Sequence, residues 1–224
     1  MMLKKMFPAA ALAISASLSL MANPVLAEVD YTKMTPEELA EYLIFETNSF
    51  KLDQPVQEGG VAKQRMVQDE LQKECTVLGG KQRDPAVLGK VSAMAYETIE
   101  YPEDGIQLGD WKRGRQLAWS GFGYRIGHKN DDHEAREVGG NCYNCHQIAS
   151  DRTGGSLGPS LYGYGRARGT SDAMLTHTYN VLYNSHAAFP CTNMPRFGVK
   201  GYLSQQDIAD IMAYLFDPES PVNQ

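Results

Sequence analysis

Apolar residues recur at helical spacing in several separate stretches of the chain, with polar and glycine-rich segments between them. Near the amino terminus, Thr35 and Glu38 form a capping box and Pro36 suits the first helical position, so we expect a helix over 35–47. The apolar face of this helix is formed by Leu39, Tyr42, Leu43 and Phe45.

A second helix is expected from Val61 to about Val77. Within it, Val67, Leu71 and Cys75 follow one another at intervals of four residues and so share one side of the helix. This spacing predicts that Cys75 points into a core.

A third helix is expected to begin at Asp84-Pro85 and to end at Tyr101-Pro102. Its apolar face consists of Val87, Val91, Met94, Ala95 and Ile99. The first hundred residues are therefore predicted to be largely helical, and none of them suggests chemistry at an active site.

The second half of the chain alternates helices with irregular segments. Helices are expected over 110–119, from residue 170 or 171 onward, and over 204–215, where Ser204 pairs with Asp207 as a cap. The glycine-rich and charged stretch 120–140 is expected to be a loop. Glycine is again dense over 147–168, which predicts irregular chain wrapped around a bound group.

The first 27 residues have the features of a secretory signal. Lys4 and Lys5 precede an apolar stretch, and Val25-Leu26-Ala27 places small residues before a cleavage point. We expect residues 1–27 to be removed and the mature, periplasmic chain to have no membrane span. Because this segment contains two lysines and no acidic residue, its loss shifts the formal charge from −6 to −8, which disfavours nucleic acid as a partner.

Cys142-Tyr143-Asn144-Cys145-His146 is the attachment pattern for a c-type haem. Two thiols at this spacing can add to the two vinyl groups of one porphyrin, and the adjacent histidine then lies beneath the iron. A thioredoxin-like pair would need a strand-to-helix context, and half of a zinc site would need another close Cys or His pair. The motif therefore predicts one covalently bound haem c, with His146 as an axial ligand.

The sixth ligand of the iron decides between electron transfer and chemistry on a small ligand. Met194 is the preferred candidate, because Asn193-Met194-Pro195 lies in a loop that could place the thioether on the iron. His177 and His186 are competing ligands, and an open site is the remaining alternative. The other candidates are expected to be core residues or solvated side chains: Met174, Met212, His128 and His133.

Two further features could support the haem. The Pro159 carbonyl, in Gly158-Pro159-Ser160-Leu161, could accept the ring N–H of His146 and fix its orientation, although the segment could also be an ordinary turn. Arginine side chains could pair with the haem propionates. The candidates are Arg166, Arg168 and Arg196.

Cys75 and Cys191 remain once the haem motif has taken its pair. In an oxidising compartment the simplest hypothesis is a disulfide between them. The alternative is a reactive Cys191 that carries substrate sulfur or bonds to a partner.

The chain resembles SoxX, the mono-haem cytochrome subunit of the SoxXA complex of periplasmic sulfur oxidation. The resemblance covers about residues 109–224 and depends on the haem motif, on 193–198 (Asn-Met-Pro-Arg-Phe-Gly) and on the closing 217–223 (Asp-Pro-Glu-Ser-Pro-Val-Asn). It implies an all-α, class I cytochrome c fold, in which the helix from Asp110 crosses the last helix. It also implies that Cys142, Cys145, His146 and Met194 are the haem-binding residues.

The resemblance further implies a role in an L-cysteine S-thiosulfotransferase. SoxXA joins thiosulfate oxidatively to a cysteine of a carrier protein, SoxYZ, and the sulfur chemistry occurs on the SoxA chain. A SoxX-like subunit would form a heterodimer with SoxA, accept the electrons and pass them to a soluble cytochrome. The alternatives are a free-standing periplasmic electron shuttle and a catalytic haem protein with an exchangeable sixth ligand.

We therefore expect three segments: a signal peptide over 1–27, a helical extension over 28–108, and a cytochrome c domain over 109–224. The extension is longer than the leader that the resemblance implies. It is expected to pack against the cytochrome domain or against SoxA.

Overall fold

The structure is a computed structural model that describes residues 29–57, 59–77, 84–123 and 132–224. The expected signal peptide and His128 lie outside these ranges. Within them the elements are helical, and β pairing is limited to the single bridge Pro55–Val61. The α-helices are α1 Pro36–Glu41, α2 Ala62–Met66, α3 Glu70–Val77, α4 Pro85–Tyr96, α5 Trp111–Trp119, α6 Tyr164–Arg168, α7 Asp172–Tyr183 and α8 Gln205–Phe216.

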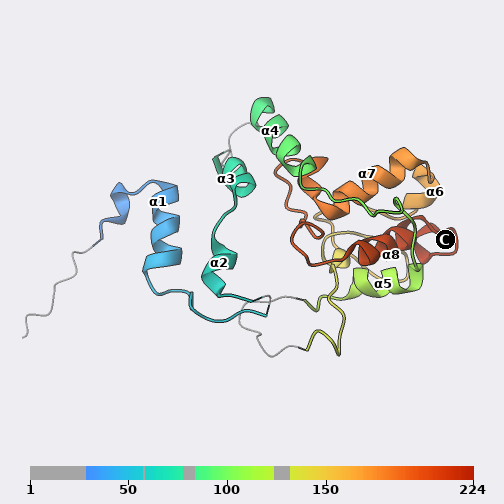
Figure 1. Ribbon diagram of the computed structural model, residues 1–224, viewed down its shortest axis with the longest axis horizontal. Helices are drawn as coiled ribbons and strands as arrows, with labels where there is room; N and C mark the ends of the chain where they lie inside the picture. Colours follow the sequence, from blue (N-terminus) through green and yellow to red (C-terminus); the bar gives the residue numbers. More distant parts are fainter. Residues whose placement is uncertain (1–28, 58, 78–83, 124–131) are drawn as a thin grey trace, which may run out of the picture.

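The crossing of α5 and α8 organises the second half of the chain (Figure 1). Asp110 caps α5 through its side chain, and Ser204 and Asp207 form a capping box at α8, both as expected. Asp210 of α8 is 2% exposed, and its carboxylate accepts hydrogen bonds from the Asp110 backbone N–H (2.8 Å) and from Arg113. A buried carboxylate therefore ties the start of α5 to α8.

Gly114 allows α5 and α8 to approach closely. A Cβ atom at this position would lie 1.9 Å from the backbone oxygen of Asp210. Around this contact the two helices bury one continuous apolar cluster. Its largest fully buried members include Leu117, Ile148, Tyr179, Ile208, Met212 and Tyr214.

We predict that Gly114→Ala lowers the free energy of unfolding by about 3 kcal/mol, because the added methyl group forces two backbones apart. Gly89→Ala in α4 is the matched control, since nothing lies within 4 Å of the Cβ position there. That control is expected to raise stability by about 0.5 to 1 kcal/mol, because alanine favours a helix over glycine. Denaturant unfolding measures both. Wild-type stability in Gly114→Ala would contradict the close crossing.

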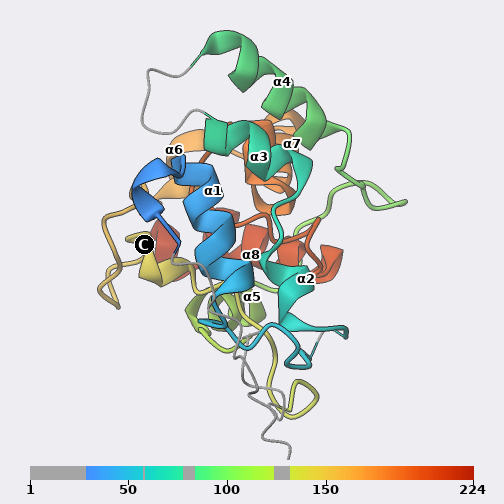
Figure 2. The same ribbon diagram turned by 90° about the vertical axis from the view of Figure 1, so that its left-hand side faces the viewer.

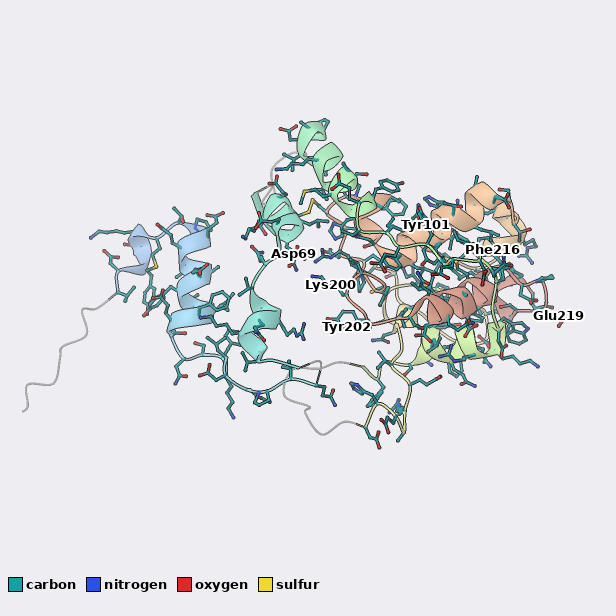
Figure 3. The ribbon with its side chains drawn as sticks, viewed as in Figure 1. Asp69, Tyr101, Lys200, Tyr202, Phe216 and Glu219 are labelled. Atoms are coloured by element: carbon teal, nitrogen blue, oxygen red, sulfur yellow. A yellow bond between two sulfur atoms is a disulfide. The ribbon has the colours of Figure 1, made fainter. Side chains whose placement is uncertain are left out.

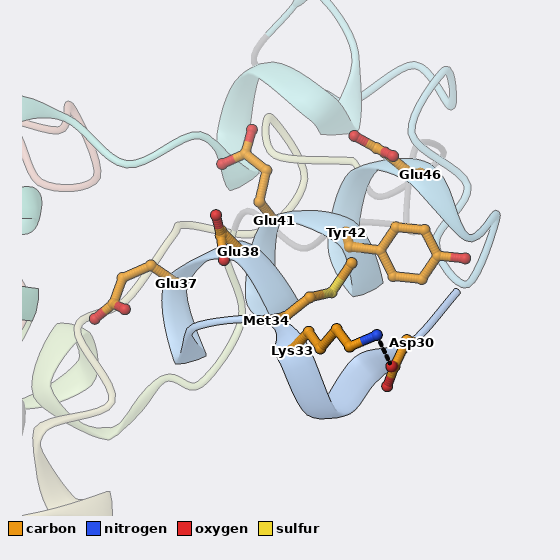
Figure 4. A pocket seen from close by; sticks show the side chains of 8 residues that line it. All are labelled: Asp30, Lys33, Met34, Glu37, Glu38, Glu41, Tyr42 and Glu46. Atoms are coloured by element: carbon orange, nitrogen blue, oxygen red, sulfur yellow. Dashed lines mark ion pairs between the residues drawn. The ribbon is translucent and has the colours of Figure 1, made fainter. Parts of the chain in front are cut away.

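The amino-terminal elements lie to one side of the α5–α8 body, as Figures 1 and 2 show. The expected capping box at Thr35 is confirmed, and α1 runs directly into a π-helical turn, Tyr42–Glu46. Neither element buries a residue. A hollow beside α1, shown in Figure 4, is lined mainly by acidic side chains (Asp30, Lys33, Met34, Glu37, Glu38, Glu41, Tyr42 and Glu46) and lies far from the haem motif in the sequence.

The single helix expected over 61–77 is wrong, because the chain breaks there into α2 and α3. Val67 adopts an extended conformation and ends α2. Asp69 and Gln72 then cap α3 reciprocally: the Gln72 N–H donates to the Asp69 carboxylate (2.9 Å), and the Asp69 N–H donates to the Gln72 amide oxygen (2.9 Å). The reciprocal cap of Asp69 and Gln72 interrupts the apolar spacing, and Val67 is exposed.

The helices α3 and α4 bury a second, smaller cluster against the cytochrome half of the chain. Its buried members are Leu71, Val91, Ala95 and Ala187, and Cys75 packs on it as expected. The α4 helix begins at Asp84 as expected but ends at Tyr96, before Tyr101-Pro102. At its end, the Thr98 hydroxyl (2.7 Å) and the Thr98 backbone N–H (3.2 Å) both donate to the Ala95 carbonyl, which caps the last turn.

The stretch expected to be irregular over 147–168 ends in a short helix, α6, so that part of the prediction is wrong. Gly163 begins α6 with φ +67°, and Gly165 lets it lie on α8, where a Cβ would be 2.7 Å from the Cα of Phe216. Ser171 stands at the start of α7, as expected. No helix in the described ranges has the length and apolar character to cross a bilayer.

The closing segment 217–223 fastens the end of α8. The Ser220 hydroxyl donates to the Tyr214 carbonyl (2.5 Å), and the Asn223 amide donates to the carbonyls of Leu215 (3.1 Å) and Asp217 (2.8 Å). Val222 is fully buried, and its carbonyl accepts the Gly163 N–H (2.7 Å). The tail is therefore a structural closure of the fold.

Candidate functional site

The two cysteines of the haem motif lie on one tight turn. Asn141 has φ +50°, a left-handed conformation that asparagine tolerates, and a 3₁₀ turn, Cys142–Asn144, follows it. The Cys142 carbonyl accepts the backbone N–H groups of Cys145 (3.1 Å) and His146 (2.9 Å). Neither cysteine takes part in a disulfide, and burial raises the pKa of the Cys142 thiol to about 12. The turn thus presents two thiols and an imidazole together.

His146 is oriented by the segment 158–161. Its Nδ1 lies 2.7 Å from the Pro159 carbonyl oxygen, so the expected contact is confirmed. Because a carbonyl can only accept, Nδ1 carries the proton and Nε2 keeps its lone pair for a metal. Gly158 lies against the same ring, where a Cβ atom would be 2.3 Å from Cε1. The ring therefore has a fixed tautomer and a fixed face.

Met194 lies in a loop that is anchored at several points. We call residues 190–200 the Met194 loop. The Met194 carbonyl accepts the hydroxyl of buried Ser185 (2.7 Å), and the Met194 N–H donates to Thr192 (3.2 Å). Gly198 packs on the Tyr183 ring. A Cβ atom at this position would lie 2.4 Å from a ring carbon. Met194 itself is partly buried and packs on the same apolar cluster as Cys142.

The competing ligands have other surroundings. His186 is buried, and its Nδ1 accepts the Cys191 N–H (3.0 Å) and lies 3.9 Å from the Cys75 sulfur. Burial, and then the charge of Arg196, lower the pKa of His186, while Asp69 opposes them. His177 packs edge-on against Phe189, at 6.2 Å between ring centroids. Both histidines therefore have contacts of their own within the protein, His186 through a hydrogen bond and His177 through a ring contact.

The other methionine, histidine and arginine candidates have the following surroundings in the structure. Met212 is fully buried in α8, as the core interpretation expected, Met174 packs on the main cluster, and His133 contacts the ring of Phe122. Arg166 donates to the Asn223 carbonyl (3.0 Å), and Arg168 lies over the Tyr164 ring. Arg196 donates to Asp69 (2.7 Å). The three arginines therefore have protein partners of their own.

The alternative interpretations of the cysteine motif lack their structural context. A thioredoxin-like pair would follow a strand, whereas Cys142 follows a left-handed residue after a glycine pair. In the part of the chain that the structure describes, no three His, Cys, Asp or Glu side chains gather as a metal-ion site. The haem interpretation fits the groups that the turn brings together: two thiols and an imidazole with one free nitrogen.

Cys75 and Cys191 form a disulfide in this structure, with their Cα atoms 5.3 Å apart and a sequence separation of 116. The bond joins α3 of the extension to the Met194 loop. Cys191 has φ +59°, an uncommon conformation for a side chain other than glycine.

The comparisons with known proteins identify the class of domain. Residues 137–217 match the model of the Cytochrome c family, so the chain contains a cytochrome c domain. The fold is an all-α class I cytochrome c domain preceded by a helical extension. A domain of this family implies covalently bound haem c and a role in electron transfer.

Two particular proteins are similar to this chain. A protein of Aquifex aeolicus (strain VF5), described as "Uncharacterized lipoprotein", is 44% identical over 131 residues. The match spans 57% of this chain and 59% of that protein, well under two thirds of its length. A crystal structure of SoxXA from P. pantotrophus aligns with 57% of this chain and 92% of its own, with 19% identity and a TM-score of 0.37. A likeness that distant carries no argument about function.

Sequence patterns alone did not indicate two polar residues that support the site. The Asp69 carboxylate accepts hydrogen bonds from Arg196 and Lys200. Asn184 is buried, and its side-chain amide donates to the Thr98 hydroxyl (2.9 Å). A sequence signal for Asp69 does exist, since Asp69-x-x-Gln72 is a capping pattern. Asn184 has no such signal, because its partner is 86 residues away.

Proposed function

We propose that this chain is a mono-haem c-type cytochrome whose one haem is bound to Cys142 and Cys145, with His146 and Met194 as axial ligands. The observation that carries the proposal is the His146–Pro159 contact of 2.7 Å, which leaves Nε2 free for the iron. When bound, the haem supplies one-electron oxidation and reduction. A filled sixth position favours this role over peroxide or small-ligand chemistry.

The protein's own residues keep such a centre rigid. His146 is held between Pro159 and the bare backbone of Gly158, and Met194 is held through its carbonyl by Ser185. If these two side chains hold a haem iron, their fixed positions would keep its surroundings similar in both oxidation states and would favour electron transfer with little rearrangement. Cys142 and Met194 both pack on the large apolar cluster, which would form one wall of the haem site.

We further propose that the chain is the SoxX-like electron-transfer subunit of a periplasmic thiosulfate-oxidising complex. The support is the combination of 193–198 with the tail 217–223. In this role it would bind a SoxA-type cytochrome subunit as a heterodimer and meet a SoxYZ-type carrier transiently. Oxidative coupling of thiosulfate to a carrier cysteine releases two electrons, which the chain would accept and pass to a soluble cytochrome. Export would depend on a signal over 1–27.

The test is purification of the full, affinity-tagged chain from thiosulfate-grown cells. A second haem-staining chain in equal amount is expected to remain bound through salt washes, and the pair is expected to reduce a soluble cytochrome when thiosulfate and carrier are supplied. A protein that runs alone in size-exclusion chromatography would contradict the subunit role and would favour the free-standing shuttle.

A further inference from the structure

The Met194 loop is tied to the amino-terminal extension on both sides of Met194. Three residues before it, Cys191 is bonded to Cys75 of α3. After it, the Asp69 carboxylate accepts hydrogen bonds from Arg196 (2.7 Å) and Lys200 (2.7 Å). Figure 3 shows Asp69 and Lys200 pointing toward one another across the space between α3 and the loop. The extension therefore contacts the loop at two separate points.

The chain leading into the loop is held by the same extension. The Ser92 hydroxyl of α4 donates to the Ala187 carbonyl (2.6 Å), and Asn184 donates to Thr98 (2.9 Å). Ala187 is 3% exposed and completes the small apolar cluster of α3 and α4. Polar and apolar contacts thus dock α3 and α4 on the segment that begins the loop.

The ion pair between Asp69 and Arg196 is partly buried, so losing one partner would be costly. The Arg196 side chain is only 10% exposed, so the pair is partly removed from water. Burial opposes ionisation of Asp69, but hydrogen bonds from Lys200 and Arg196 outweigh it and hold the pKa of that carboxyl well below its usual range. Removing one partner from a desolvated pair leaves the other charge uncompensated.

The disulfide also holds an unfavourable backbone conformation. Cys191 is left-handed at φ +59°, and its N–H is fixed on buried His186 (3.0 Å). Such conformations persist only where the surrounding structure over-determines them. Cys191 lies three residues from Met194, so release of the bond would let this strained point relax and move the sulfur.

We propose that residues 69–77 and 84–98, which include α3 and α4, form a clamp that positions the Met194 thioether, with Asp69, Cys75 and Cys191 as its positioning residues. This inference rests on the proposed function, because it presupposes that Met194 ligates the iron. The physical reason is pre-organisation: a neutral thioether is a weak ligand, and a loop that is already ordered loses less entropy when its sulfur binds. Freed from the clamp, the loop would spend more time with the sulfur away from the iron.

The test compares three variants of the full, haem-loaded protein. The double variant Cys75→Ala/Cys191→Ala removes the bond without leaving a free thiol. Asp69→Asn removes the charge, but asparagine can still cap α3, because it retains a side-chain oxygen. Glu74→Gln is the matched control: it removes a carboxylate of α3 that is paired with Lys90 of α4 (2.7 Å) and not with a residue of the loop.

Two measurements report on the sulfur and on the loop that carries it. One is carbon monoxide binding to the reduced haem, which requires the sixth ligand to leave. The other is hydrogen exchange of the backbone amides of the Met194 loop. We expect the double variant to bind carbon monoxide at least about tenfold faster than the wild type, and Asp69→Asn to bind it several-fold faster. A tenfold change corresponds to a free-energy difference of about 1.4 kcal/mol. Loop amides are expected to exchange faster in both, and Glu74→Gln should match the wild type.

The outcomes separate the clamp from the ligand assignment on which it rests. Met194→Leu is measured in parallel and must give unhindered carbon monoxide binding if Met194 is a ligand. If it does so while Asp69→Asn and the double variant both behave like Glu74→Gln, the clamp is overturned and the ligand assignment stands. If Met194→Leu leaves binding as slow as in the wild type, the ligand assignment itself fails. Asp69→Asn keeps the test decisive if the double variant does not fold.

Discussion

Met194→Leu is expected to abolish the weak absorption band near the red end of the visible range that is typical of oxidised haem with a methionine ligand. Leucine nearly conserves the side-chain volume, so packing changes by less than about 1.5 kcal/mol, while the sulfur is lost. With no thioether, the iron gains an exchangeable position and the reduction potential falls, since a Met/His pair raises it. Absorption spectroscopy and redox titration of the purified protein measure both effects.

Met212→Leu is the matched control for this prediction. It makes the same chemical change at a fully buried methionine of α8 that packs in the core. The red band and the potential are expected to be those of the wild type. A red band that survives in Met194→Leu would contradict the assignment and would direct attention to His186 or His177, whose replacement would then be the next experiment.

Cys142→Ala/Cys145→Ala is expected to eliminate covalent haem almost completely. Each thiol can form one thioether to a vinyl group, so with both removed nothing bonds the porphyrin to the chain. Haem-staining of the denatured protein and mass analysis of the peptide that contains residues 142–146 measure the loss. The extension disulfide variant, Cys75→Ala/Cys191→Ala, removes the same number of cysteines and is expected to keep its covalent haem. Pigment that stays bonded to the chain in Cys142→Ala/Cys145→Ala would refute the attachment site.

Helix starts were predictable from sequence where a cap is built from neighbouring residues. Thr35, Asp84, Asp110 and Ser204 each combine a short polar side chain with a suitable partner within a few residues, and a helix begins at each. The break between α2 and α3 was missed because the apolar spacing through Val67 continues across it. There the reciprocal cap of Asp69 and Gln72 outweighs periodicity.

Within the candidate site, short-range chemistry was predictable and long-range chemistry was not. The Pro159 contact of His146 follows from two nearby motifs, 13 residues apart. The Asp69–Arg196 pair joins residues 127 positions apart, and an arginine in a sequence can equally well pair with a propionate, an acid or water. Only the docking of α3 and α4 on the cytochrome domain decides that choice, and this docking depends on tertiary packing.

The most direct test of the central claim, that the Met194 sulfur ligates the iron opposite His146, is the NMR spectrum of the reduced protein with carbon-13 in its methionine methyl groups. A methyl group held against the face of a haem experiences the ring current of the porphyrin and resonates far outside the ordinary methionine range. We expect one such methyl signal in the wild type and none in Met194→Leu. A displaced signal that persists in Met194→Leu, or a wild-type spectrum in which every methionine methyl lies in its ordinary range, would contradict the claim.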